Sequence, residues 1–85
     1  MPSPHSDAHA DLGRAIRKLR NARGVSQEEL AHRSALDRSY MGGVERGERN
    51  LGLTNLVRIA GALGVRPSEL LAEAERIGDE RQRHE

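Results

Sequence analysis

The 85-residue chain contains no cysteine, no phenylalanine and no tryptophan, and Tyr40 is its only tyrosine. A core without these side chains has to be built from leucine, isoleucine, valine, alanine and methionine, and no disulfide can support it. No apolar run approaches the roughly 20 residues that a membrane-spanning helix needs, and no charged and then apolar leader is found at the start. We therefore expect a cytoplasmic protein with no membrane segment.

The net charge of +1 hides an uneven distribution along the chain. Residues 9–66 contain 11 Lys or Arg against 6 Asp or Glu, a net charge of +5, whereas residues 67–85 contain 3 against 6, a net charge of −3. A basic body with an acidic end indicates a polyanionic partner for the body. Solvated faces of mixed charge would explain the same numbers, so charge alone does not decide.

Apolar residues recur at helical spacing over most of the chain, and neither a strand pattern nor an internal repeat is found. Residues 1–8 contain two prolines and no apolar periodicity, so we expect a disordered tail. The first helix is predicted to end near Gly24, because glycine is a common helix stop. Its apolar face consists of Leu12, Ala15, Ile16 and Leu19.

Two further helices are predicted in the second half of the chain. The first is the most hydrophobic segment and ends at Gly64. Its apolar residues are Leu53, Leu56, Val57, Ile59, Ala60 and Leu63. The other begins at Pro67 and ends at Gly78, and residues 79–85 follow as a charged tail. The pattern therefore predicts an all-α domain over residues 9–78.

Between these segments lie two short helices that are joined by a tight turn. Ser26 and Glu29 fit a capping box at the start of the first, which runs to about Ser34. Asp37 is a good cap for the second, which runs from Arg38 to about Glu45. Two short capped helices with a three- or four-residue connection are typical of a helix-turn-helix.

In a helix-turn-helix, the second helix enters the major groove of DNA, and its N-terminal residues contact base edges. With Met41 and Val44 turned inward, the groove-facing residues of helix 38–45 are Arg38, Ser39, Gly42 and Gly43. Each glycine costs about 1 kcal/mol relative to alanine inside a helix. We interpret the pair as a thinned face that lets the backbone approach the DNA, although a frayed or kinked helix would explain it too.

Arg38 can make paired hydrogen bonds to a guanine edge, and a phosphate or carboxylate contact is its alternative role. The residues expected to contact the DNA backbone are Ser26, Gln27, Tyr40, Arg46, Arg49 and Asn50. Gln27 lies beside the amide donors of a helix start, which favour anions. For Tyr40 partial core packing is the competing role, and loop arginines can simply be solvated.

The segments "SQEELAHRSALDRSYMGGVERGERN" and "LTNLVRIAGALGV" resemble the phage Cro and repressor helix-turn-helix class, the XRE family. The resemblance spans roughly Leu12 to Leu71. It implies a five-helix, lambda-repressor-like fold and a transcriptional regulator that binds a partly palindromic operator of double-stranded DNA as a homodimer. The segment "LDRSYMGGVERGERN" is most similar to the small controller proteins of restriction-modification genes.

The resemblance also implies roles for individual residues. Gln27 matches a phosphate-contacting glutamine, and Arg20 with Glu45 matches a partly buried ion pair. Three positions depart from the family pattern. Ala35 stands where many members have a turn glycine, Leu51-Gly52 replaces a common proline-serine pair, and Gly43 lacks a side chain that other members use to read bases. Operator preferences of relatives therefore do not transfer.

The fifth helix is predicted to carry more apolar surface than the core covers. The expected dimer contacts are Leu70, Leu71, Ala74 and Ile77. Complete burial of this strip within the monomer is the alternative. We expect no cofactor and no small-molecule effector, because no segment remains for a second domain.

Catalysis is not expected. His5 and His9 have a spacing that could bind a metal, but they lie at the predicted tail and lack a third ligand. His32 has serines nearby without a triad carboxylate, and the glycines of "MGGVERGERN" lack the lysine of a phosphate loop. The remaining alternative is an antitoxin-type interaction module that binds DNA mainly together with a partner protein.

Overall fold

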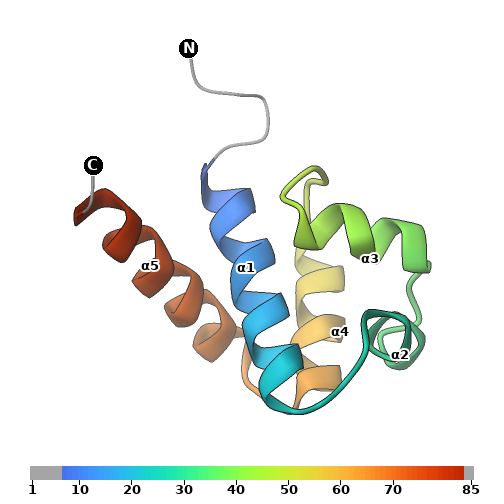
Figure 1. Ribbon diagram of the computed structural model, residues 1–85. Helices are drawn as coiled ribbons and strands as arrows, with labels where there is room; N and C mark the ends of the chain where they lie inside the picture. Colours follow the sequence, from blue (N-terminus) through green and yellow to red (C-terminus); the bar gives the residue numbers. More distant parts are fainter. Residues whose placement is uncertain (1–6, 84–85) are drawn as a thin grey trace.

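The computed structural model describes residues 7–83, which form five α-helices (Figure 1). The helices are α1 (Asp7–Ala22), α2 (Gln27–Arg33), α3 (Arg38–Glu45), α4 (Leu53–Leu63) and α5 (Pro67–Arg83). Over this range no residue lies in a strand. The predicted all-α, five-helix architecture is therefore confirmed.

Both outer helices are longer than the sequence pattern predicted. α1 begins at Asp7, inside the predicted tail, and α5 continues past Gly78 to Arg83. Gly78 is a poor helix former, yet it is buried against Asp11 of α1, so a tertiary contact outweighs local propensity. The remaining parts of the two predicted tails, residues 1–6 and 84–85, lie outside the described residues.

The predicted caps of α2 and α3 form, with one difference. Ser26 Oγ accepts a hydrogen bond from the Glu29 amide at 3.0 Å, and the Asp37 carboxylate accepts one from the Ser39 amide at 3.0 Å. The Glu29 carboxylate, however, accepts from Arg33 at 2.6 Å on the same helix face. Only half of the predicted capping box is present, because an i,i+4 ion pair takes the glutamate.

Two departures from the family pattern have visible consequences. Ala35 has φ 57°, a left-handed conformation that costs a residue with a Cβ about 1 kcal/mol or more. Gly64, in the corresponding conformation after α4, has φ 74° and does not incur that cost. Gly52 precedes α4 without any side-chain cap, as expected from the loss of the serine.

The core is aliphatic, as the absence of large aromatics required. Its fully buried large side chains are Ile16, Leu30, Met41, Ile59, Leu63 and Leu70. Leu53 and Val57, which were predicted to belong to the apolar face of α4, are instead 75% and 49% exposed. The hydrophobicity of α4 therefore exceeds what the monomer buries.

α1 lies at the centre of the molecule and separates two regions (Figure 1). On one side α5 packs along α1 and also contacts α4. On the other side lie α2 and α3, which contact each other and α1. α5 contacts neither α2 nor α3. The helix pair predicted to face DNA is thus separate from the C-terminal helix.

Candidate nucleic-acid interface

The N-terminal end of α3 is open to solvent. Arg38 and Ser39 are exposed, and the Arg38 side chain makes no ion pair or hydrogen bond with any residue in the described range 7–83. An unpaired guanidinium at this end keeps all five of its donors available. The geometry suits the predicted base-reading role of these two residues, which remains a prediction.

The two glycines of α3 are buried, which overturns the idea of a bare backbone face. A Cβ atom built on Gly42 would lie 3.0 Å from Arg46 Nη1, and one built on Gly43 would lie 2.6 Å from Arg49 Cγ. The side chains of these two arginines therefore cover the glycines. The glycines make room for these arginine side chains, which cover much of the backbone of α3 at this point.

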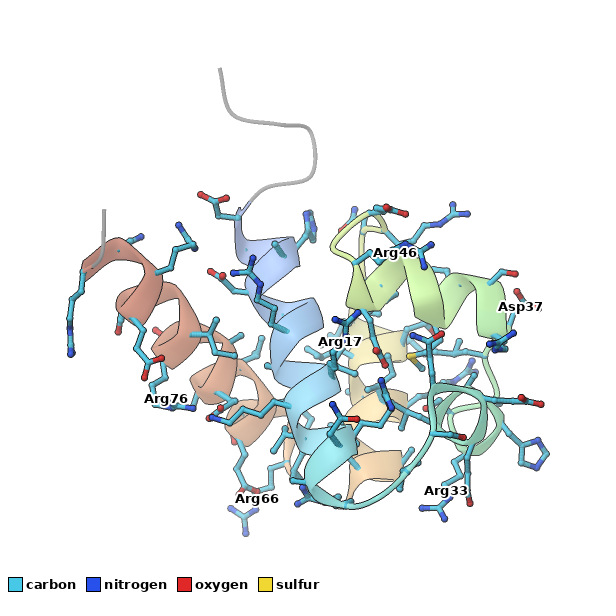
Figure 2. The ribbon with its side chains drawn as sticks, in the orientation of Figure 1. Arg17, Arg33, Asp37, Arg46, Arg66 and Arg76 are labelled. Carbon is cyan, nitrogen blue, oxygen red and sulfur yellow. The ribbon has the colours of Figure 1, made fainter. Side chains whose placement is uncertain are left out.

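Five of the predicted contact residues come together at one polar pocket. The pocket has a volume of about 260 Å³ and is lined by Gln27, Arg38, Ser39, Gly42 and Arg46. Figure 2 shows Arg46 on the outer side of α3, near the end opposite the Asp37 cap. The start of α2 and both ends of α3 thus contribute to one surface with two guanidinium groups.

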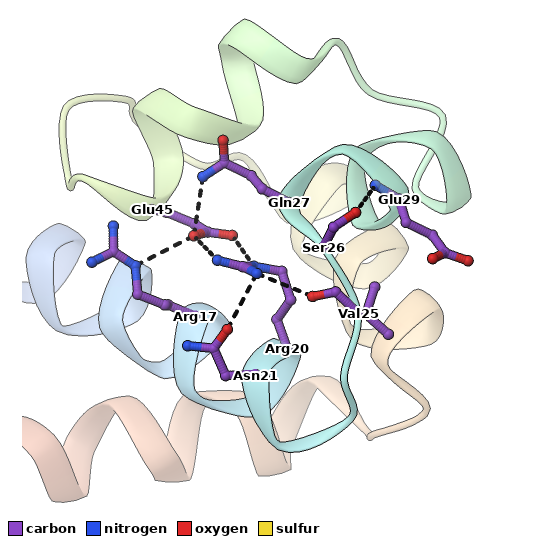
Figure 3. Close-up of polar contacts among 8 residues, drawn as sticks. All are labelled: Arg17, Arg20, Asn21, Val25, Ser26, Gln27, Glu29 and Glu45. Atoms are coloured by element: carbon purple, nitrogen blue, oxygen red, sulfur yellow. Dashed lines mark hydrogen bonds and ion pairs between the residues drawn. The ribbon is translucent and has the colours of Figure 1, made fainter.

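Behind this surface lies the predicted ion pair, which is present. Arg20 donates to both carboxylate oxygens of Glu45, from Nε to Oε2 at 2.8 Å and from Nη2 to Oε1 at 3.0 Å (Figure 3). Its Nη1 donates to the carbonyl of Val25 at 3.0 Å. The Glu45 side chain is completely buried, so these hydrogen bonds compensate for its lost hydration.

Two more donors meet the same carboxylate (Figure 3). Gln27 Nε2 donates to Glu45 Oε1 at 3.2 Å, and Arg17 Nε does so at 3.5 Å. The predicted phosphate contact of Gln27 is not tested, but its amide is oriented by Glu45. The sequence did not identify Arg17 as a partner of Glu45, although Arg17 lies one helical turn before Arg20 and so on the same face of α1.

Tyr40 and Asn50 make internal contacts. The Tyr40 ring packs against the core, and its hydroxyl accepts from Asn55 Nδ2 at 3.2 Å and donates to the Asn50 carbonyl at 3.4 Å. Asn50 Oδ1 lies 3.2 Å from His9 Nε2. These contacts favour the packing alternative for Tyr40. Ser26 and Arg49 have the structural contacts described above, and their backbone-contact roles stay predictions.

The predicted dimer strip on α5 is only partly available. Leu70 and Ala74 are buried in the monomer core, and Ile77 packs against it. The prediction that they form a surface strip is therefore wrong for Leu70 and Ala74, because α1 covers that face of α5. Leu71 is 45% exposed and is the one large apolar side chain of the strip at the surface.

Polar contacts that the sequence did not reveal also fix α5 to α1. Arg81 Nη2 donates to Asp11 Oδ2 at 2.9 Å, and the Asp11 side chain is buried. At the other end Lys18 Nζ lies 2.7 Å from Glu73 Oε1. Hydrogen bonds from Arg76 and Lys18 hold the pKa of Glu73 below its ordinary value.

Residues 7–83 contain neither a candidate metal site nor a membrane-spanning helix. No group of three or more His, Asp or Glu side chains lies close enough together to hold a metal ion, and His5 is outside the described range. None of the described helices combines the length and apolar character that crossing a bilayer requires.

A capped helix pair with an exposed arginine at the start of its second helix is the arrangement of a DNA-binding helix-turn-helix. Residues 16–70 match the Helix-turn-helix family, and the chain belongs to the XRE type of this family. It is a transcription regulator of the controller and repressor type.

Individual relatives agree with this assignment. Control protein C.BamHI of Bacillus amyloliquefaciens is 43% identical over 61 residues, covering 71% of this chain and 75% of the relative. Control protein C.MunI of a Mycoplasma species is 38% identical over 72 residues, which cover 84% of this chain and 97% of the relative. Among solved structures, the restriction-modification controller protein C.AhdI of Aeromonas hydrophila is similar, with a TM-score of 0.71 and 54% sequence identity. The match covers 72% of this chain and 92% of C.AhdI.

Proposed function

We propose that this protein binds a palindromic DNA operator as a homodimer, with α3 of each copy in the major groove. The observation that carries the proposal is the pocket at the start of α3, where Arg38 and Ser39 are exposed beside the guanidinium of Arg46. A guanidinium at the N-terminal end of such a helix can donate two hydrogen bonds to a guanine edge.

The distribution of charge supports an orientation in which α3 faces the DNA. The exposed arginines at α3 are Arg38, Arg46 and Arg49, whereas the one acidic residue within α3, Glu45, is buried and paired. Exposed acidic residues flank them at the start of α2, at the Asp37 cap and at Glu48. The acidic C-terminal segment belongs to α5, which contacts neither helix of the pair. With α3 in the groove, its exposed arginines would meet the DNA, and the acidic segment of α5 would lie away from it.

The apolar surface that the monomer leaves open supports a homodimer. Leu71 lies at an apolar pocket of about 630 Å³ between α1, α5 and the start of α4, together with Leu12, Leu51 and Leu56. Leu53 and Val57 of α4 are also exposed apolar side chains. We propose that a second copy covers this surface, so that two reading helices lie about 34 Å apart, one turn of DNA.

The relatives suggest what the regulator controls. C.AhdI is named a restriction-modification controller protein, and this chain shares 54% of its aligned residues. By this likeness we propose that the protein regulates the genes of a restriction-modification system. Transcription of a reporter behind the selected operator, with and without the protein, tests activation and repression.

Selection of bound duplexes from random DNA tests the proposed operator. The wild type is expected to enrich a two-fold symmetric motif, and Arg38→Ala is expected to lose the preference at one position of each half-site, by roughly 5- to 150-fold. Arg76→Ala is the matched control, because Arg76 lies on α5 and pairs with Glu73 and Glu80. No enriched motif for the wild type would contradict the proposal.

The antitoxin-type alternative predicts a different result. A module that needs a partner protein would bind the selected duplex weakly when alone, whereas a regulator of this kind shifts it at nanomolar concentration, within the range typical of specific DNA binding. A gel-shift titration with the purified protein decides between them.

Sedimentation tests the proposed dimer surface. Leu71→Asp is expected to yield monomers and weaken operator binding, because it places a charge in an apolar contact. Ala72→Asp is the control, since Ala72 is exposed on the same helix and does not line the apolar pocket. An intact Leu71→Asp dimer would exclude this surface.

A further inference from the structure

Gly42 lies four residues before Arg46, and helical side chains point back toward the N-terminus of their helix. The side chain of residue 46 therefore runs over residue 42. A Cβ atom on Gly42 would lie 3.0 Å from Arg46 Nη1 and 3.4 Å from Gln27 Oε1. Because Gly42 has no side chain, the Arg46 guanidinium can lie over the middle of α3, within the pocket that Arg38 also lines.

A second contact holds the other edge of this guanidinium. Arg46 Nε donates to Glu48 Oε1 at 3.0 Å, and both side chains are more than half exposed. This contact uses one of the five donors of the guanidinium and leaves the terminal nitrogens available for a ligand. Gly42 and Glu48 together therefore orient a long side chain that would otherwise have many rotamers.

From this arrangement we propose that Arg46 is a second base-reading residue, and that Gly42 and Glu48 are its positioning residues. The inference rests on the proposed function and deepens it. Residues 38 and 42 lie on one face of α3, one helical turn apart, so a guanidinium over Gly42 faces the base pairs next to those that Arg38 contacts. The expected base is guanine, whose O6 and N7 accept a bidentate arginine.

The pairing with Glu48 favours a base over a phosphate. An arginine that serves only as a phosphate contact gains from its full positive charge. Here a carboxylate lies 3.0 Å from Nε and would repel a nearby phosphate. Hydrogen bonds to a neutral base edge are affected less by that carboxylate, and they depend more on a fixed orientation.

The experiment compares four proteins by selection from random duplexes and by titration of the enriched duplex at several salt concentrations. They are the wild type, Arg46→Ala, Gly42→Ala and Gly61→Ala. Gly61 is the matched control, because it lies within α4, is exposed, and has no atom within 4 Å of an added Cβ. All four are first checked for folding by thermal unfolding.

We expect Arg46→Ala and Gly42→Ala to lose preference for guanine at the same position of each half-site, by roughly 5- to 150-fold. Gly42→Ala should unfold at no lower temperature than the wild type. The added methyl group displaces only the flexible end of Arg46, and alanine favours the helix. Gly61→Ala should keep the full wild-type motif. A fifth protein, Glu48→Gln, compared in the same way, should show a weaker preference at this position and a higher affinity for random DNA.

Three results would overturn the inference, and each differs from a failure of the proposed function. A wild-type motif that Arg46→Ala leaves unchanged would show that Arg46 reads no base. A uniform loss of affinity across sequences, with the salt slope reduced by about 0.9, would make Arg46 a phosphate contact only. A Gly42→Ala protein that retains the guanine preference would remove the positioning role. A wild type without any motif would instead contradict the proposed function itself.

Discussion

The two sides of α1 are each joined to a neighbouring helix by a buried carboxylate that pairs with an arginine. On the α3 side Glu45 accepts hydrogen bonds from Arg20, Gln27 and Arg17. On the α5 side Asp11 accepts from Arg81 alone among the hydrogen bonds described, at 2.9 and 3.4 Å. Glu45 is thus the more extensively bonded of the two carboxylates.

This difference between the two carboxylates matches the roles proposed for α3 and α5. The Arg20 side chain is only 13% exposed, whereas that of Arg81 is 23% exposed and also contacts the exposed Asp7. Because a base-reading helix has to keep its side chains in a fixed geometry, a rigid attachment of α3 serves recognition directly. α5 is held to α1 mainly by packing along its length, and it contributes to the core and to the proposed dimer surface.

Glycines allow close contacts on both sides of α1, but the groups that they contact differ. On the α5 side, Gly78 admits the carboxylate of Asp11, since a Cβ atom there would lie 2.7 Å from Asp11 Oδ2. At the base of α3, Gly13 admits the main-chain carbonyls of Val44 and Glu45, at 2.5 Å from a Cβ atom. Gly42 instead makes room for a flexible arginine on the surface. Rigid neighbours make the first two sites structural, and a movable neighbour makes Gly42 a candidate for function.

The largest effect is expected from Glu45→Ala. It leaves the mostly buried Arg20 without its carboxylate, at a cost of about 3–5 kcal/mol in the free energy of unfolding. Urea unfolding at pH 7 measures the loss. Glu48→Ala is the control, because this exposed carboxylate pairs only at the surface and should change stability by less than about 0.5 kcal/mol. Equal losses would contradict the assigned difference in burial.

Asp11→Ala is expected to cost less, about 1–3 kcal/mol, because Arg81 keeps access to water and to Asp7. The same urea experiment provides the comparison, with Glu28→Ala, an exposed residue of α2, as the control. A loss as large as that of Glu45→Ala would show that the two buried carboxylates contribute equally to stability.

Ala35→Gly is expected to stabilise the protein by about 0.5–1 kcal/mol. The left-handed φ of 57° costs alanine more than the extra unfolded-state entropy costs glycine. Thermal and urea unfolding measure the gain. Ala72→Gly, in the exposed middle of α5, should instead destabilise by about 1 kcal/mol. A loss at both positions would mean that the turn between α2 and α3 is not strained.

The smallest effect concerns Glu73 on the α5 side, which accepts hydrogen bonds from Arg76 and pairs with Lys18. Because the pKa of Glu73 is lowered in the folded state, its contribution to stability is present above the ordinary value of 4.5 and is lost as pH falls through the folded-state pKa. Glu73→Gln should therefore narrow the stability difference between pH 7 and pH 3. An unchanged pH profile would show that this partly exposed contact contributes nothing measurable.

The sequence predicted local structure well and long-range polar contacts poorly. The caps at Ser26 and Asp37 and the glycine stop at Gly64 are local signals, and all three were recognised. The Arg20–Glu45 pair followed from the family resemblance. Asp11 and Arg81 are 70 positions apart and belong to no recognised motif, so no periodicity connects them.

The same limit explains the errors at the candidate site. Helical spacing placed Gly42 and Gly43 on the outer face of α3, but it could not show that Arg46 and Arg49 fold back over them. Spacing also could not show which part of the α5 strip α1 covers, so Leu70 was assigned to the surface. Helical spacing shows which residues share a face of a helix, but it does not show which side chains or helices cover that face.

The most direct test of the proposed separation between the two sides is an NMR titration of the labelled protein with the selected operator duplex. The account predicts that the largest amide shift changes occur at Gln27 and over residues 38–49, with residues 76–83 of α5 nearly unchanged. Largest changes on the outer surface of α5, with α3 unaffected, would contradict it.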